Sequence, residues 1–290
     1  MKISLSILAL ALFAFFSASA QVSVDVTMDQ KQFLSSEAVP VAVHITNRSG
    51  QSLHLGADAG WLTFDVESAD GFIVLKNADV PVIGAFDVGS SQVATKRVDL
   101  APYFVLSKPG RYRVIATVRI KAWNVEINSS PLKFDVISGA KLASQDFGVP
   151  APAGMTNTLP DVRKYNLIEA NYLESQLRLY VQVTDESESR VFNVTPIGKL
   201  ISFSTPETQL DRHSNFHVLW QSNASSFTYT EVNPNGQILR QETYDYVTTR
   251  PRLGLSATGD VQVVGGVRRL SSNELPVVKM PDQPVAPVNP

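Results

Sequence analysis

The histidines are the first residues of this chain whose types and spacing can do chemistry. There are four of them, His44, His54, His213 and His217, and there is no cysteine. His213 and His217 are four residues apart, and on a helix that spacing would turn both imidazoles toward one zinc ion. The stretch DRHSNFHVLWQ around them alternates instead like a loop that enters a strand. Because the other two histidines lie far away in the chain, we expect no metal site and no cofactor.

A hydrolytic centre needs a nucleophile held beside a base. Asp211 and His213, with a nearby serine, have the residue types of a catalytic triad. The chain has no G-x-S-x-G motif to expose such a serine on a sharp turn. The absence of cysteine also excludes thiol nucleophiles, thiolate metal ligands and disulfides. We therefore expect no catalytic residue.

Tyrosines and arginines concentrate near the end of the chain, in the stretches TYDYVTTRPR and GGVRR. Guanidinium groups and aromatic rings are good recognition surfaces for acidic or sugar-like ligands and for proteins. If the strands that carry them end together, one binding surface forms from Tyr244, Tyr246, Arg250, Arg252, Arg268 and Arg269. The alternative is that these residues keep a sheet edge soluble.

The compartment follows from the first twenty residues. Lys2 precedes an apolar run over residues 3–16, and Ala18 and Ala20 occupy the small-residue positions of a cleavage site. This pattern predicts a signal peptide over residues 1–20, cleaved before Gln21. The run is about 14 residues long, whereas a membrane span needs roughly 20. We therefore expect an exported protein, periplasmic or extracellular, and the lack of cysteine is ordinary for a bacterial one.

Charge and hydropathy limit the partners. The formal net charge is −2, which gives no general attraction to nucleic acid or to anionic membranes. After the signal peptide, no segment of the sequence is long and apolar enough to span a membrane. The expected partner is therefore an unidentified protein or a glycan.

Strands must position all of these residues. Residues 21–138 alternate with period two, as in VPVAVHITN, where Val39, Val41, Val43 and Ile45 share one face. Glycine, proline and Asn-Arg-Ser clusters separate roughly six or seven such runs, which predicts a two-sheet antiparallel sandwich.

The stretch SKPGRYRVIATVRI places a Pro-Gly turn directly before a strand that contains Tyr112. It resembles the penultimate strand of bacterial immunoglobulin-like modules, in which an xPGxYxVxxxV stretch is common. The resemblance covers residues 21–138 and implies an immunoglobulin-like fold and an exported protein, but no activity. An antibody-type domain is excluded because there is no cysteine pair.

The second half of the chain contains a repeat. VTPIGKLISF and VNPNGQILRQ share the frame V-x-P-x-G-x-(L/I), and LSATGDVQVV keeps its glycine. We expect each copy to be a β-hairpin whose turn glycine, Gly198, Gly236 or Gly259, has a positive φ. The copies resemble the hairpins of β-propeller blades but are too few to close a ring. We expect them to form an antiparallel β-meander over residues 165–274 that closes on itself, although closure with another chain stays open.

Prolines are frequent in the segments before and after this meander. Pro150, Pro152 and Pro160 fall between the two halves, so we expect a linker over residues 139–164. Prolines recur every few residues over 275–290, which predicts a disordered tail.

The fold class expected from the sequence is therefore all-β, with an immunoglobulin-like antiparallel sandwich followed by an antiparallel β-meander. The expected function is non-catalytic, as an interaction or structural module of the bacterial envelope or exterior. Two alternatives stay open. One is a hydrolase or enzyme accessory subunit with a site at the domain junction, and the other is an inhibitor that acts through the sandwich loops.

Overall fold

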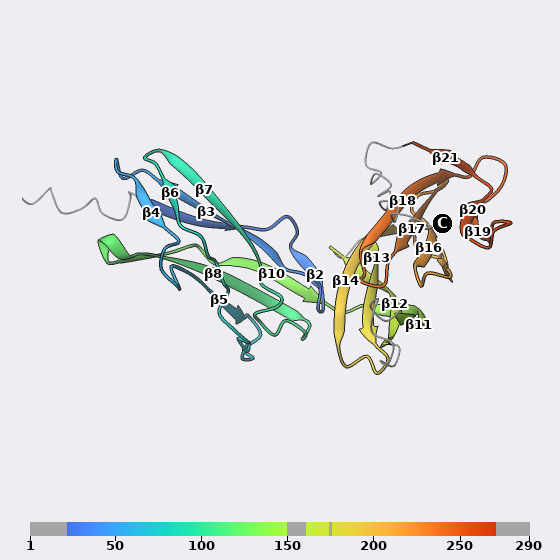
Figure 1. Ribbon diagram of the computed structural model, residues 1–290, viewed down its shortest axis with the longest axis horizontal. Coiled ribbons are helices and arrows are strands. Elements are labelled where there is room, and N and C mark those ends of the chain that lie inside the picture. Colours follow the sequence, from blue (N-terminus) through green and yellow to red (C-terminus); the bar gives the residue numbers. More distant parts are fainter. Residues whose placement is uncertain (1–21, 150–160, 174–175, 271–290) are drawn as a thin grey trace, which may run out of the picture. The chain divides into compact units, whose positions relative to one another are not determined.

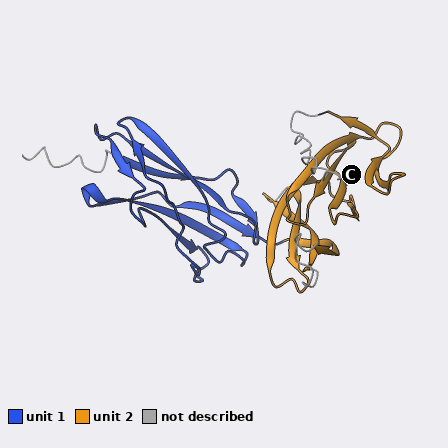
Figure 2. Cartoon of the chain, viewed as in Figure 1, with its two compact units in different colours: residues 1–138 blue, residues 139–290 orange. Residues whose placement is uncertain are grey.

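A computed structural model describes residues 22–149, 161–173 and 176–270 of the chain. Its contacts divide the chain into two compact units, Met1–Ser138 (unit 1) and Gly139–Pro290 (unit 2) (Figure 2). Both are built from sheets whose strand pairs are antiparallel with one exception in unit 1, so the all-β fold class is confirmed. The expected signal peptide and the expected tail lie outside the described residues. Within those residues, no helix combines the length and the apolar character needed to cross a bilayer.

Unit 1 is a sandwich of two main sheets (Figure 1). The first contains β1 (Val22–Thr27), β3 (Pro40–Asn47) and β7 (Gln92–Asp99), in that order. The second has the order β2 (Gln32–Leu34), β10 (Leu132–Ile137), β8 (Gly110–Ile120) and β5 (Leu62–Ser68), and β9 (Val125–Asn128) pairs with β8. A short ribbon joins β4 (Leu53–Leu55) to β6 (Phe86–Val88), and a 3₁₀ helix, η2 (Lys121–Trp123), precedes β9. The pairing of β1, β3 and β7 in one sheet and of β5, β8 and β10 in the other is the order of an immunoglobulin-like sandwich.

The core of unit 1 comes from the period-two alternation of its strands. In β1 every second residue is buried, and the facing side chains of both sheets form one apolar cluster. Tyr112 stands at the start of β8, where its hydroxyl donates a hydrogen bond to the carbonyl oxygen of Lys108 at 2.5 Å. Its ring stacks on Phe134 with the ring centroids 5.5 Å apart. This is the tyrosine corner of immunoglobulin-like domains, so the PGRY motif is structural.

Unit 2 contains two meanders (Figure 1). Its first sheet runs in chain order through β11 (Ala140–Val149), β12 (Asp161–Tyr172), β13 (Gln176–Asp185) and β14 (Val191–Leu200). Its second sheet has the order β15 (Glu207–Leu210), β16 (Phe216–Gln221), β17 (Ser226–Val232), β18 (Ile238–Asp245) and β21 (Val267–Arg269). A separate two-stranded ribbon consists of β19 (Arg252–Leu255) and β20 (Val261–Val264).

The prediction of a linker over residues 139–164 is wrong for its first part. Ala140–Val149 is strand β11, which pairs along its length with β12. Phe147 is 5 % exposed and stacks on Tyr165 with 4.1 Å between the ring centroids. The prolines that suggested a linker all fall within residues 150–160, outside the described residues. Attention to these prolines led us to overlook the strand that precedes them, Ala140–Val149.

Strand β16 is buried on both faces, which the sequence did not predict. Phe216, Val218 and Trp220 point into the core between the two sheets of unit 2. His217 and Leu219 point to the opposite face, where they are 2 % exposed each. There the apolar residues of the β19–β20 ribbon pack over the sheet. A strand that is covered on both faces consists mainly of apolar residues without alternation. His217 is the polar exception in β16, and it is buried.

Two of the three expected hairpin turns are present. Gly236 lies between β17 and β18 with φ +78°, and Gly259 lies between β19 and β20 with φ +82°. The hairpin turn expected at Gly198 is wrong: this glycine has the expected positive φ, +146°, but it lies inside strand β14. There the register slips past Ile197, which forms a β-bulge. A Cβ atom on Gly198 would lie 2.9 Å from the indole ring of Trp220, so glycine is needed there for close packing.

The turn between β13 and β14 provides a first prediction. Asp185 accepts hydrogen bonds from Ser187 Oγ at 2.5 Å, Ser189 Oγ at 2.9 Å and the Arg190 backbone N–H at 2.7 Å. These bonds, with that of Ser187 the largest cause, lower the pKa of the Asp185 carboxyl to about 2. Because the folded pKa is depressed, this stabilisation is present above about pH 4 and is lost as the pH falls toward 2.

The measurement is an NMR titration of the Asp185 carboxyl carbon. We expect its midpoint near pH 2 in the native chain and closer to the ordinary value of 3.8 in Ser187→Ala. Equal midpoints in the two chains would contradict the assigned cause.

Candidate functional site

The structure brings two of the six expected binding residues together. Tyr244 on β18 and Arg268 on β21 are direct cross-strand neighbours and lie on the same face of the second sheet of unit 2. Both line a pocket of about 470 Å³ between this sheet and the β19–β20 hairpin, within the size range of small-ligand sites. We call it the arginine pocket. Its polar lining comes from Tyr229, Arg240, Glu242, Tyr244 and Arg268 of the sheet and from Ser256, Thr258, Asp260 and Gln262 of the hairpin.

The other four expected residues do not line this pocket. Arg269 follows Arg268 on β21, and its guanidinium donates instead to Asp245 at 2.8 Å. Arg250 lies over the ring of Phe227 at 5.2 Å. The last two, Tyr246 and Arg252, are exposed outside the pocket lining. Successive residues of a strand face opposite sides of the sheet, so Arg268 and Arg269 cannot both line this pocket.

A buried carboxylate holds the arginine pocket together. Glu242 is 5 % exposed and accepts a hydrogen bond from the Tyr244 hydroxyl at 2.6 Å. Arg268 Nη2 lies 3.2 Å from the same carboxylate, and Arg240 Nη1 lies 3.8 Å from it. Burial, together with the hydrogen bond to Glu242, raises the pKa of Tyr244, so its hydroxyl stays a donor. Glu242 thus fixes the positions of two guanidinium groups at the pocket wall.

Tyr229 connects the pocket to the interior of the sheet. Its hydroxyl accepts a hydrogen bond from Arg240 Nη2 at 2.8 Å and lies 2.7 Å from His217 Nδ1. Burial raises the pKa of Tyr229 to about 12, so the side chain is neutral. Burial lowers the pKa of His217 against the opposing effect of Glu231 and Asp211, so the imidazole is also neutral near pH 7.

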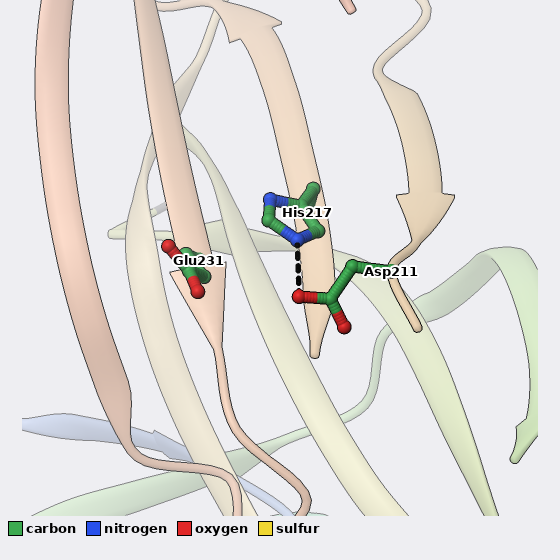
Figure 3. A group of neighbouring side chains, drawn as sticks. All are labelled: Asp211, His217 and Glu231. Carbon is green, nitrogen blue, oxygen red and sulfur yellow. Dashed lines mark ion pairs between the residues drawn. The ribbon is translucent and has the colours of Figure 1, made fainter. Parts of the chain in front are cut away.

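His217 ends this chain of contacts at a pair of carboxylates (Figure 3). Asp211 Oδ2 lies 3.4 Å from His217 Nε2, and Glu231 is the cross-strand neighbour of His217 on β17. We call Asp211, His217 and Glu231 the histidine cluster, whose potential ligand atoms all lie within 4.8 Å of one another. Asn215 Nδ2 donates to both carboxylates, at 3.0 Å to Asp211 and 3.2 Å to Glu231.

Asp211 also shapes the loop between β15 and β16. Its Oδ1 atom accepts the backbone N–H groups of His213 and Asn215, both at 2.8 Å. Burial would raise the pKa of Asp211, but these hydrogen bonds outweigh burial and lower it, so the carboxylate is ionised. His213 itself is exposed, with Nδ1 3.7 Å from Asp211 Oδ2. His213 and His217 are a loop and a strand histidine, as the alternation around them suggested.

Sequence reasoning missed the residues that depend on strand register. Arg240, Glu242 and Tyr229 lie on β17 and β18, and only the pairing of these strands brings them beside Tyr244. Glu231 meets His217 because the hairpin places them opposite each other. An available signal was the VNPNG turn, since a hairpin around it fixes which residues of the flanking strands face each other.

No protein-family model matches the sequence, and no curated protein sequence matches it either. Among solved structures, the chain is similar to the crystal structure of Spo0M, a sporulation control protein from Bacillus subtilis. The identity is 12 % and the TM-score 0.29, over 59 % of this chain and 82 % of that one. A likeness of this size carries no argument about fold or function.

Proposed function

We propose that this chain is an exported, non-catalytic interaction module of the bacterial envelope or exterior, and that it binds a glycan in the arginine pocket. Export is supported by the signal-like pattern of the first twenty residues. Binding in unit 2 is supported by one observation: a pocket of ligand size whose walls are two guanidinium groups, two tyrosines and the hydroxyl, amide and carboxylate groups of a hairpin.

The charge balance of the pocket favours an uncharged polar ligand. Arg240 and Arg268 face the buried carboxylate of Glu242. On the hairpin side, Asp260 is paired with Arg212 at 3.2 Å. An anionic ligand would therefore compete with carboxylates already in place, whereas sugar hydroxyls can accept from the guanidinium groups and donate to the carboxylates. A neutral glycan uses both kinds of group without displacing either.

Binding to an array of bacterial and plant oligosaccharides, followed by calorimetry on the best ligand, tests this function. We expect Arg268→Ala to weaken binding at least about tenfold, because a hydrogen bond from a charged group contributes about 1.5–3 kcal/mol. The matched control is Arg269→Ala, which removes the same charge from the next residue of β21, outside the pocket lining. Its affinity should stay within about twofold of that of the native chain.

Two results would overturn the proposal. One is the absence of any oligosaccharide bound by the native chain. The other is an equal loss of affinity in Arg268→Ala and Arg269→Ala, which would mean that general positive charge, and not the pocket, attracts the ligand.

A further inference from the structure

We propose that the histidine cluster of Asp211, His217 and Glu231 is a binding site for a divalent transition-metal ion of the zinc class. The site goes beyond the glycan-binding function. It lies on the far side of Tyr229 from the arginine pocket, and its ligands do not line that pocket. The inference departs from the sequence-based expectation of no metal site, which counted histidines and cysteines and left the carboxylates out.

The spacing of the cluster fits a metal ion. Two ligand atoms bound to zinc at about 2.0–2.1 Å in tetrahedral geometry lie about 3.3–3.4 Å apart. His217 Nε2 and Asp211 Oδ2 are 3.4 Å apart. All three potential ligand atoms lie within 4.8 Å of one another, so a small side-chain movement of Glu231 completes a three-ligand set. One imidazole with two carboxylates is a donor set that suits zinc or manganese.

A second observation concerns the imidazole itself. The His217 side chain is 3 % exposed, and its Nε2 atom makes no hydrogen bond with any of the described residues. Its nearest charged atom is Asp211 Oδ2 at 3.4 Å, and burying a polar atom without a hydrogen bond is unfavourable. This atom faces the carboxylate of Asp211, and Glu231 lies beside the pair (Figure 3). A bound cation would give the Nε2 lone pair a ligand bond and would balance the charge of the carboxylates at the same time.

The surrounding residues orient the imidazole as metal sites require. A metal-binding histidine usually has its second ring nitrogen held by a hydrogen bond, which fixes the ring and the tautomer. Here His217 Nδ1 lies 2.7 Å from the Tyr229 hydroxyl. Arg240 donates to that hydroxyl at 2.8 Å, which leaves it free to accept from Nδ1–H as well. In that tautomer the Nε2 lone pair points into the cluster.

The charged groups around the cluster are compatible with a bound cation. Arg240 Nη2 lies 3.3 Å from Glu231, but the same guanidinium also faces the buried Glu242. Asn215 bridges the two cluster carboxylates and adds no charge. One guanidinium is therefore shared between Glu231 and Glu242.

The test uses the mature, tag-free chain, freed of metal with a chelator and titrated with zinc in competition with a zinc-sensitive dye. Absorption spectra of the cobalt-loaded chain report the coordination geometry. We expect one zinc ion per chain and tetrahedral cobalt bands. Asp211→Asn and Glu231→Gln keep the size of each side chain and remove its charge, and each should weaken zinc binding at least about tenfold.

The control is an exposed histidine–carboxylate pair in unit 1. His54 Nδ1 lies 2.8 Å from Asp87 Oδ1, and both side chains are more than half exposed. The variant His54→Gln with Asp87→Asn should bind zinc as the native chain does. Circular dichroism of the metal-free variants checks that each one folds.

Three outcomes would overturn the site. They are the absence of stoichiometric zinc in the native chain, zinc binding that persists unchanged in Asp211→Asn with Glu231→Gln, and loss of the zinc in the unit 1 control. Zinc lost only from the two cluster variants would establish the site whether or not the arginine pocket binds a glycan.

Discussion

Replacing Trp220 with alanine should lower the free energy of unfolding of unit 2 by about 3–5 kcal/mol. The side chain is 1 % exposed and lies in the core between the two sheets. Its ring packs against the backbone of Gly198, and its Nε1–H donates to the carbonyl oxygen of Lys199 at 2.8 Å. Truncation leaves a cavity beside Gly198, which has no side chain to fill it, and it leaves the Lys199 carbonyl without its donor.

Urea unfolding followed by far-ultraviolet circular dichroism measures this effect. Trp220→Phe is the graded control, because it keeps an aromatic ring and loses the hydrogen bond to Lys199. Its cost should be clearly smaller than that of Trp220→Ala. A loss below about 1 kcal/mol in Trp220→Ala, where large buried side chains ordinarily cost several, would show that the two sheets do not pack around this residue.

Replacing Gly236 with valine should lower the free energy of unfolding by about 2–3 kcal/mol. Two costs add. A β-branched residue at φ +78° is strained by about 1–2 kcal/mol. Its Cβ would also lie 2.7 Å from the side chain of Asn193, which donates to the carbonyl oxygen of Asn235 at 3.0 Å. Displacing that side chain removes a hydrogen bond of about 1 kcal/mol between the turn and strand β14.

Gly259 provides the matched control for this prediction. It has nearly the same φ, +82°, but a Cβ added there meets no atom within 4 Å. Gly259→Val should therefore show the strain alone, about 1–2 kcal/mol. The two variants are compared by the same urea titration. Equal costs would show that the turn at Gly236 does not dock on β14, and a loss of glycan binding without any loss of stability would make the turn part of a binding site.

The sequence was informative wherever one face of a strand is buried and the other is exposed. Unit 1 is of this kind, and the alternation in VPVAVHITN and the PGRY turn were enough to predict its sandwich. Tyr112 was identified by its position after the turn, and its hydroxyl forms the hydrogen bond that this position implies. Here local pattern and tertiary structure agree, so the prediction needed no knowledge of strand order.

The predictions failed where tertiary packing overrides the local pattern. Gly198 and Gly236 share one sequence frame, yet only Gly236 turns the chain, because a bulge against Trp220 uses Gly198 inside a strand. β16 is covered on both faces, so alternation does not reveal that His217 is buried. Tyr244 and Arg268 were found by residue type alone. Their partners Arg240 and Glu242 were not, since their meeting depends on register.

The parallel pairing of β2 with β10 has a consequence for how unit 1 is made. Gln32 lies beside Asp135, 103 residues later in the chain, so the second sheet of unit 1 is completed by almost its last residues. Closing so long a loop costs entropy before any contact compensates for it, and such topologies fold slowly. In unit 2 most strands pair with the next one in sequence and can assemble as they emerge from the ribosome. Unit 1 instead cannot complete its second sheet until its final strand has been synthesised.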